Sequence, residues 1–207
     1  MSQISYGQEI SRKLVHLSSL WMAAALLLLP RPFCAILFGV MTVLTVIVEY
    51  AYYKKVPVIT GCYGFFFGRM LRDYGNGKFH LSGGAPVLAA ACLSAIYFER
   101  PYSALAMAVM LLGDTAAALI GRRFGKHRFF NGKSLEGTLA FITTGTAVVL
   151  IGFAAFGYPS WTVLAGGLLG VVLAAALELF NCELQLDDNL SIPLAVGAGF
   201  LLGAMFA

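Results

Sequence analysis

Long runs of apolar residues alternate with short polar segments along the whole chain. A run of about 17 to 25 apolar residues is long enough for a helix to cross the hydrocarbon core of a bilayer. Seven runs approach this length, although the third and seventh are short or rich in glycine: 14–29, 33–53, 84–98, 103–121, 137–156, 161–180 and 190–206. Backbone groups in lipid must be satisfied internally, so we expect all seven to be helices. The pattern predicts an all-α bundle of about seven transmembrane helices.

Turn-forming residues and polar segments separate these runs. Proline or glycine marks three tight connections, at 30–32, near 101 and at 157–159, which would lie on one side of the bundle. The longer connections would lie on the other side: 54–83, 122–136 and 181–189. Since no second soluble region is evident, we expect residues 1–207 to form a single membrane-embedded domain.

The basic residues are distributed unevenly between these two sides. With the N-terminus inside, 12 of the 14 Lys and Arg residues fall on inner segments, and only Arg31 and Arg100 fall outside. Cytoplasmic segments of membrane proteins are enriched in Lys and Arg. The bias therefore predicts a cytoplasmic N-terminus and an external C-terminus, in the plasma membrane if the source is prokaryotic. Because the polar start of the chain enters the first run without a small-residue cleavage site, we interpret that run as a retained span.

Composition supports a lipid environment. The chain is 59% hydrophobic and 12% charged, with a mean hydropathy of +0.82, whereas a soluble domain is near half apolar and about a quarter charged. Its net charge of +4 does not indicate a nucleic-acid partner, because the basic residues lie between predicted spans. The four cysteines are scattered without a C-x-x-C pair, which argues against a zinc site or a disulfide framework.

One inner segment, 61–74, combines aromatic and basic residues. We expect it to form a loop resting on lipid headgroups, with an amphipathic interfacial segment or a dip into the membrane as the alternatives.

Asp114 stands within an apolar run, where a carboxylate costs roughly 2.5–3.5 kcal/mol at mid-bilayer. It precedes Gly121 by seven residues, which places it about 10 Å from the predicted helix end. The face that it shares with Ala118 and Gly121 could border a polar cleft reached from the cytoplasm. The structural alternative is an acid paired with a nearby arginine.

The connection that follows has features of a phosphate-binding loop. Gly121, Gly125 and Gly132 would allow backbone amides to approach an anion, and the helix that opens after Ser134 would offer its N-terminus. Positive charge comes from Arg122, Arg123, Lys126, Arg128 and Lys133. The sequence Gly132-Lys133-Ser134 is not a Walker A loop, because His127 occupies the position of its first glycine and no strand precedes it.

Other predicted helices carry polar stripes that end on the same side. One small-residue face ends in Glu178 and Asn181. Arg12 and His16 share a face of the first run, and Glu49 lies on a face of the second. Three further polar residues precede the last run: Asp187, Asp188 and Asn189. Small residues on a face usually pack helices together, so each stripe has a purely structural alternative.

Acidic and basic residues thus converge on one leaflet. Carboxylates bind Mg²⁺, and cations with helix N-termini hold phosphates, which are the components of phosphoryl transfer. A transporter would carry its charges nearer the midplane. The pattern favours an enzyme acting on a lipid whose headgroup lies at this depth.

Three blocks of the sequence resemble the CTP-dependent lipid kinases, namely dolichol kinase, phytol kinase and the CTP-using diacylglycerol kinase, which are distantly akin to phosphatidate cytidylyltransferases. The most specific block runs from Gly113-Asp114-Thr115 to Gly132-Lys133-Ser134-Leu135-Glu136-Gly137. The others are E-x-x-R-K-x-x-H, from Glu9 to His16, and D-D-N-x-x-x-P, from Asp187 to Pro193.

The resemblance implies transfer of the γ-phosphoryl group of CTP to the hydroxyl of a membrane lipid such as a polyprenol, dolichol, phytol or diacylglycerol. Our hypothesis for the mechanism is that Mg²⁺ is held by Asp114 and by Asp187 or Asp188. The triphosphate would be neutralised by Lys133, Arg122 and Arg12 or Lys13, with Ser134 and Glu136 also at the nucleotide. The proton acceptor stays open between His16, Glu178 and an acid of 187–189.

Two other functions remain open at this point. A cytidylyltransferase would make a CDP-lipid from a lipid phosphate such as phosphatidate and release pyrophosphate. A small transporter or scaffold would carry out no catalysis and would bind no nucleotide.

Overall fold

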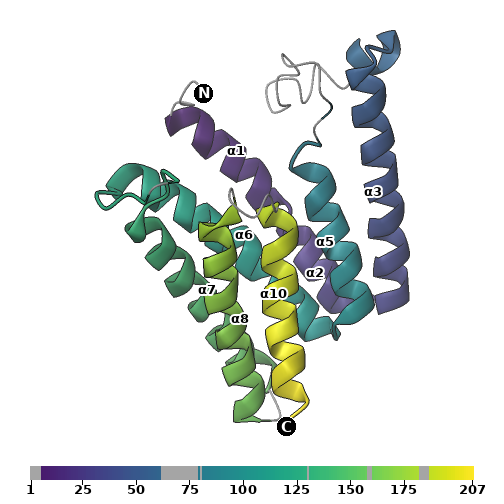
Figure 1. The fold of residues 1–207 in the computed structure, drawn as a ribbon. Helices are drawn as coiled ribbons and strands as arrows, with labels where there is room; N and C mark the ends of the chain where they lie inside the picture. The colour runs from purple at the N-terminus through teal and green to yellow at the C-terminus, as the bar shows by residue number, and fades with distance from the viewer. Residues whose placement is uncertain (1–5, 62–78, 80, 130, 158–159, 182–186) are drawn as a thin grey trace.

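Helices form nearly all of the computed structural model, which describes residues 6–61, 79, 81–129, 131–157, 160–181 and 187–207 (Figure 1). The part of the chain so described contains no strand, and one isolated antiparallel bridge joins Arg128 to Ser134. The helices are α1 (Tyr6–Ser18), α2 (Leu20–Leu28), α3 (Arg31–Tyr53), α5 (Gly84–Tyr97), α6 (Arg100–Phe124), α7 (Leu135–Phe156), α8 (Trp161–Leu179) and α10 (Asp188–Ala204). The predicted all-α architecture is confirmed.

Four helices are long and apolar enough to cross a membrane, namely α3, α6, α7 and α8. The other apolar helices are shorter: α2 has 9 residues, α5 has 14 and α10 has 17. The protein is therefore a membrane protein with four candidate spans among the described residues, and the count of seven and the cytoplasmic N-terminus remain predictions. The predicted interfacial segment 61–74 lies, apart from Gly61, outside the described residues.

The expected first span, 14–29, is not one continuous helix. It is divided at Ser19, whose amide donates to His16 O at 3.0 Å and whose carbonyl accepts from Met22 N at 2.9 Å. Such i to i−3 bonds tighten the backbone and end the regular α-helical ladder. The break separates α1, which carries charged side chains, from the apolar α2, so the two can serve different surroundings.

The long helix α6 lies at the centre of the bundle, in contact with α1, α2, α5, α7 and α10. Its buried side chains include Met107, Val109, Met110 and Leu111, each fully buried. Asp114 follows this apolar stretch on the same helix. Because neighbours surround α6, its C-terminal half is held firmly where the other polar segments converge.

Helices α8 and α10 pack together through glycines. A Cβ on Gly166 would lie 2.9 Å from Gly203 Cα, and one on Gly199 would lie 2.8 Å from Gly170 Cα. Small residues allow two helix backbones to approach this closely in a membrane. The predicted small-residue face of α8 is buried, and Glu178 stands at its end with 7% exposure.

Helix α3 forms the outer layer and pairs mainly with α5 (Figure 1). Its large apolar side chains face outward, as lipid-facing side chains do: Phe33, Ile36, Val40, Val43, Leu44 and Ile47 are more than half exposed. Glu49 is the exception, since it is fully buried and accepts a bond from Ser82 N at 2.8 Å. Glu49 therefore ties the segment before α5 to α3 and does not reach the polar site described below.

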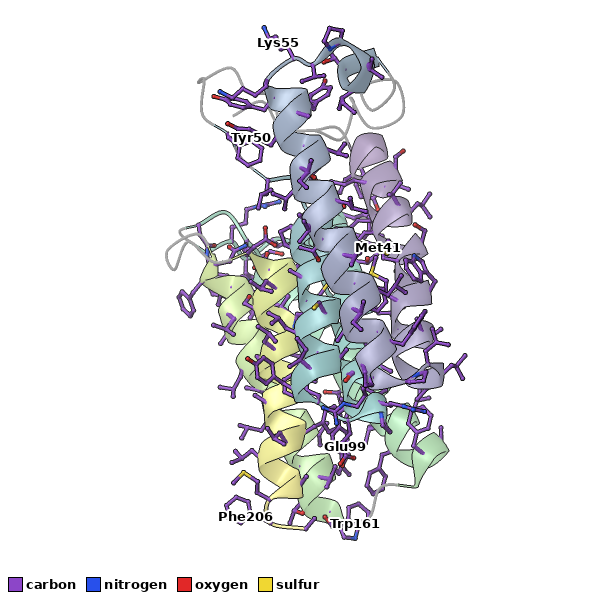
Figure 2. All side chains as sticks on the ribbon, turned by 90° about the vertical axis from the view of Figure 1, so that its right-hand side faces the viewer. Met41, Tyr50, Lys55, Glu99, Trp161 and Phe206 are labelled. Carbon is purple, nitrogen blue, oxygen red and sulfur yellow. The ribbon has the colours of Figure 1, made fainter. Side chains whose placement is uncertain are left out.

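The two ends of the bundle differ. The start of α1, the end of α6, the start of α7, the end of α8 and the start of α10 lie at one end, and the C-terminus lies at the other (Figure 1). Glu99, Trp161 and Phe206 lie at the latter end, opposite Tyr50 and Lys55 (Figure 2).

Candidate active site

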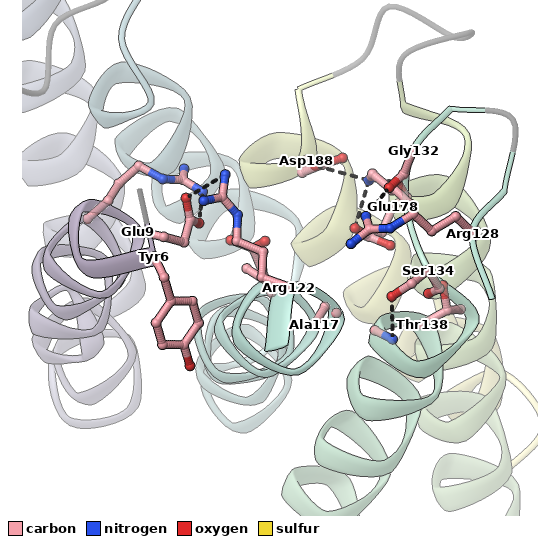
Figure 3. Close-up of a pocket in the computed structure, with 16 residues that line it drawn as sticks. Tyr6, Glu9, Ala117, Arg122, Arg128, Gly132, Ser134, Thr138, Glu178 and Asp188 are labelled. Carbon is pink, nitrogen blue, oxygen red and sulfur yellow. Dashed lines mark hydrogen bonds and ion pairs between the residues drawn. The ribbon is translucent and has the colours of Figure 1, made fainter. Parts of the chain in front are cut away.

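A pocket of about 550 Å³ opens at the N-terminal end of the bundle, between α1, α6, the start of α7 and the ends of α8 and α10. Figure 3 shows Glu9 and Arg122 on one side of it and Ser134, Glu178 and Asp188 on the other. Ten residues predicted from the sequence to bind phosphate, metal or substrate line this pocket: Arg12, Asp114, Gly121, Arg122, Arg128, Gly132, Lys133, Ser134, Glu178 and Asp188. Residues from opposite ends of the chain are therefore brought together in one place.

Asp114 is paired with Lys13 at one wall of the pocket. Lys13 Nζ lies 2.5 Å from Asp114 Oδ2, and the Lys13 side chain is only 2% exposed. His16 Nε2 lies 3.3 Å from the same oxygen. A buried ammonium is an effective counterion, so Asp114 can stay ionised in an apolar helix. Lys13 and His16 do not line the pocket and act on it through Asp114.

Lys133 occupies the opposite wall. Its ammonium donates to Glu178 Oε1 at 2.7 Å and to the backbone carbonyl of the same residue. It lies 3.7 Å from Asp188 Oδ2. An ammonium has three donors, and Glu178 takes two of them. Lys133 therefore fastens the connection to the end of α8 and also places a positive charge in the pocket.

Asp188 has more acceptor capacity than its described neighbours satisfy. Asn181 Nδ2 donates to its Oδ2 at 2.5 Å, whereas its Oδ1 and the Asn181 Oδ1 are buried without a hydrogen-bond partner among the described residues. Asp188 is the first residue of α10 and lies outside the four candidate spans. Burial raises its pKa to about 7; Lys133 opposes this rise, and the carboxylates of Asp114 and Glu178 add to it. A cation at Asp188 would relieve this crowding of negative charge.

Two glycines predicted for the site, Gly121 and Gly125, allow α6 and the residues after it to pack closely against the start of α7. A Cβ on Gly121 would lie 2.9 Å from Ser134 Oγ, and one on Gly137 would lie 2.9 Å from Ala117 O. A Cβ on Gly125 would lie 2.7 Å from Ser134 Oγ and would also meet Gly121 O. Gly132 has open space around it but a φ of +82°, a conformation that glycine adopts without strain. The glycines thus set the path of the connection that carries Lys133.

Ser134 and Glu136 hold the beginning of α7. Ser134 Oγ accepts from Gly137 N at 3.1 Å, which is the standard cap of a helix N-terminus. Glu136 accepts from His127 Nδ1 at 2.8 Å and from His127 N at 3.2 Å, and it does not line the pocket. Since Leu135 N donates to His127 O at 2.9 Å, the α7 N-terminus already has internal partners.

The remaining predicted residues lie away from the pocket. Arg123 and Lys126 are exposed, and the Arg123 guanidinium stacks over Phe124, 5.3 Å from the ring centroid. Asp187 Oδ1 accepts from the backbone and side-chain amides of Asn189, each at 3.0 Å, and so caps α10. Neither set is brought to Asp114 by the fold.

Glu9 and Tyr6 are residues of the pocket on α1 that were not assigned a role from the sequence. Glu9 is 2% exposed and contacts both Arg12 Nη2, at 2.5 Å, and Arg122 Nη2, at 3.4 Å. Tyr6 lies one turn before it and also lines the pocket. The E-x-x-R spacing contained the signal for Glu9, because residues three apart on a helix are neighbours.

The pocket thus combines carboxylates at Asp114 and Asp188 with cations at Arg12, Arg122 and Lys133. Among the described residues, no three His, Cys, Asp or Glu side chains group closely enough to hold a metal ion by themselves. Mg²⁺ does not require such a cage, because it is usually bound by one or two carboxylates together with substrate phosphates. The arrangement is suited to a phosphate-bearing substrate that brings or shares a divalent cation.

Comparisons with known proteins reveal relatives at modest identity. The chain is 26% identical over 195 residues to RP860, an uncharacterized protein of Rickettsia prowazekii, with 94% of both chains covered. It is 27% identical over 209 residues to probable phytol kinase 3 of Glycine max, covering 91% of this chain. It is 34% identical over 96 residues to phytol kinase of Synechocystis sp., covering 45% of this chain. No protein-family model matches the chain, and no solved structure matches it.

The chain spans 61% of the length of the Glycine max relative and 40% of that of the Synechocystis relative. The longest matched segment nevertheless includes nearly all of this chain. The chain is thus similar to proteins named as phytol kinases, over nearly its whole length in one of them and over about half of its length in others.

Proposed function

We propose that this protein is a membrane-embedded kinase that transfers the γ-phosphoryl group of CTP to the hydroxyl of an isoprenoid lipid alcohol. The observation that carries the proposal is the pocket itself, in which Asp114 and Asp188 lie with Arg12, Arg122 and Lys133 at one end of an apolar helix bundle. Similarity to phytol kinases supports the lipid alcohol as acceptor, and the sequence blocks at Asp114 and Lys133 support CTP as donor.

The cations bind the triphosphate. Lys133, Arg122 and Arg12 come from three different segments, so their charges can contact several phosphates at once. Arginine and lysine bound to phosphate oxygens offset the negative charge that gathers during transfer. Arg12 and Arg122 lie on one wall of the pocket and Lys133 lies on the other, so together they would hold the nucleotide between α1 and the end of α8.

Mg²⁺ fits the acidic residues of the pocket. The buried, unpartnered Oδ1 of Asp188 offers the hard oxygen ligand that this ion prefers. Asp114 and Asp188 would hold the ion, and Asn181 would orient Asp188. Its chemistry is to neutralise the phosphates and to fix their geometry. Asp187 contributes indirectly, because it caps the helix on which Asp188 lies.

The reaction is an in-line displacement at the γ-phosphorus. The alcohol oxygen forms a bond to that phosphorus, the bond from phosphorus to the β–γ bridging oxygen breaks, and CDP leaves. The alcohol proton passes to a carboxylate of the pocket, for which Glu178 is the candidate, or to water. Loose phosphoryl transfer needs little base assistance, so positioning of the two substrates provides most of the rate.

Four basic residues from the predicted inner segments line the pocket, namely Arg12, Arg122, Arg128 and Lys133, which supports a cytoplasmic active site. Nucleotide would enter from the cytoplasm, and the alcohol would enter from the bilayer.

The donor and acceptor are tested together with purified protein in detergent. Each of CTP, ATP, GTP and UTP, labelled at the γ-phosphate, is incubated with phytol, farnesol, undecaprenol, dolichol or diacylglycerol, and labelled lipid is separated by chromatography. The proposal predicts labelled phosphate on an isoprenoid alcohol with CTP as the preferred donor. The proposal is contradicted if no combination of nucleotide and alcohol yields labelled lipid, provided that the thermal melting curve shows the protein to be folded.

A further inference from the structure

Glu9 is a buried carboxylate that the phosphoryl-transfer scheme above does not use. Its side chain is 3% exposed, and it is held between two guanidinium groups, with Arg12 Nη2 at 2.5 Å and Arg122 Nη2 at 3.4 Å. Arg12 belongs to its own helix α1, whereas Arg122 lies in the last turn of α6. One acid therefore joins two cations that come from sequence positions more than a hundred residues apart.

Both arginines line the pocket, and both remain partly open to it. The Arg12 side chain is 55% exposed and that of Arg122 is 36% exposed, in contrast to the buried Glu9. Figure 3 shows the carboxylate of Glu9 beside Arg122 at the side of the pocket opposite Asp188. In this cluster the acid is buried, and the two arginines, whose side chains are of a type that binds phosphate, are exposed.

Electrostatics explains why an acid is useful at this place. Two guanidinium groups on the same wall repel each other, and the repulsion would turn their flexible side chains apart in the absence of a ligand. A carboxylate shared by both cancels part of that repulsion and limits their rotamers. A phosphate then meets a preformed pair and loses less free energy to ordering the side chains.

Helix docking is the competing role for Glu9, since its contact with Arg122 joins α1 to α6. A second ion pair, Lys13 with Asp114, already joins the same two helices one turn further along α1. That pair is buried at 2.5 Å, so α1 keeps a firm attachment to α6 without Glu9. The distinctive property of Glu9 is that it holds two pocket cations together.

We infer that Glu9 is a positioning residue, which holds Arg12 and Arg122 as one paired binding group for the polyphosphate of the nucleotide. The inference rests on the proposed function for the identity of the substrate, but the binding of a polyphosphate can be measured without turnover. The pair then favours ligands with two or more linked phosphates over single phosphates.

Kinetics of Glu9→Gln provide the first test. Glutamine keeps the size and a hydrogen-bond acceptor but removes the charge. We expect the KM for CTP to rise about tenfold with kcat within about twofold of wild type, because an interaction made equally in the ground and transition states affects KM alone. The KM for the lipid alcohol stays unchanged. Glu9→Asp keeps the charge and recovers part of the loss, and Glu99→Gln, an exposed acid at the far end of α6, serves as the matched control.

Equilibrium binding separates this inference from the proposed function. Wild-type protein in detergent is titrated with CTP and with inorganic tripolyphosphate, and the same titrations are made with Glu9→Gln, with Arg12→Ala/Arg122→Ala and with the triple variant. We expect Glu9→Gln to weaken both ligands about tenfold and to add nothing once both arginines are absent, since coupled residues are not additive.

The outcomes are distinct. Wild-type protein that binds tripolyphosphate but phosphorylates no lipid overturns the proposed function and leaves the role of Glu9 standing. Unchanged binding in Glu9→Gln overturns the role of Glu9 and leaves the kinase standing. A uniform loss of kcat and of affinity for both substrates, together with a lowered melting temperature in Glu9→Gln and Glu9→Asp alike, shows helix docking alone and also overturns the inference. Wild-type protein that binds neither ligand overturns both.

Discussion

The ammonium of Lys13 lies 2.5 Å from Asp114 Oδ2, and this contact joins α1 to α6 across 101 positions of the sequence. It sets the electrostatics of the pocket, because the carboxylate that stands in an apolar helix is neutralised from a second helix. The same contact links the N-terminal block of the sequence to its most specific block.

Replacement of Lys13 by Met is expected to destabilise the protein by about 3 kcal/mol, because removal of one partner leaves a buried charge without compensation. The double variant Lys13→Met/Asp114→Leu regains much of that stability, because neither charge remains. Thermal unfolding in detergent measures both changes, and Lys54→Met, at the exposed end of α3, is the control. Full stability of the single Lys13→Met variant would show that the pair is not a buried ion pair.

Asp114→Asn and Asp188→Asn are each expected to lower kcat/KM about 100-fold. Asp188→Asn is expected to keep a melting temperature near that of wild type, whereas Asp114→Asn also leaves the buried Lys13 ammonium unpaired and lowers it. The amide keeps the shape of the carboxylate but is a poorer ligand for Mg²⁺. Activity is measured over a range of Mg²⁺ concentrations, and excess metal should partly rescue a variant that has lost affinity. Near-normal activity at limiting Mg²⁺ in either variant would remove that carboxylate from the proposed metal site.

The connection that bears Lys133 depends on glycines at its start. Gly125→Ala is expected to cost about 1–3 kcal/mol and to lower activity, because its Cβ would meet Ser134 and the carbonyl of Gly121. Gly61→Ala is the control, since a Cβ there meets nothing within 4 Å. Unfolding curves and steady-state rates are compared for the two variants. If the two variants have the same stability and the same activity, the connection does not pack against α6 as described.

Close packing of α8 and α10 holds Glu178 next to Asp188. Gly199→Ala places a methyl group 2.8 Å from Gly170 Cα, and the resulting overpacking is expected to cost about 1–3 kcal/mol. Gly39→Ala on α3 is the matched control, because its Cβ would meet only Cys92 Sγ at 3.4 Å. Alanine also has a higher helix propensity than glycine, so this variant is not expected to lose stability. A Gly199→Ala protein that melts above the Gly39→Ala protein would show that the two helices are further apart.

Much of this architecture could be predicted from periodicity. The apolar runs that became α3, α6, α7 and α8 differ from the observed bounds by only a few residues. The face of α8 that ends in Glu178 was evident because small residues recur at helical spacing. These features depend on residues that are close together in sequence, so the spacing of the side chains along the chain is sufficient to predict them.

Other features depend on contacts that spacing does not encode. The break at Ser19 reflects the different surroundings of α1 and α2, and nothing in the local sequence forbids a continuous helix there. Gly121 and Gly125 were predicted to allow backbone amides to approach an anion, and the spacing did not show that the fold also places both against Ser134. The partners of Glu9 include a residue on α6, so its place between two arginines emerges only once the helices are packed.

The position of the transferred label tests the central claim most directly. Purified protein is incubated with the isoprenoid alcohol and with CTP labelled either at the γ-phosphate or at the α-phosphate, and the lipid product is isolated. If the protein is a lipid kinase that uses this pocket, the wild type transfers the γ-label to the lipid and leaves the α-label in CDP. The Asp114→Asn variant then forms neither labelled lipid nor labelled CDP. Transfer of the α-label to lipid with release of pyrophosphate, or γ-transfer that persists in Asp114→Asn, would contradict the account.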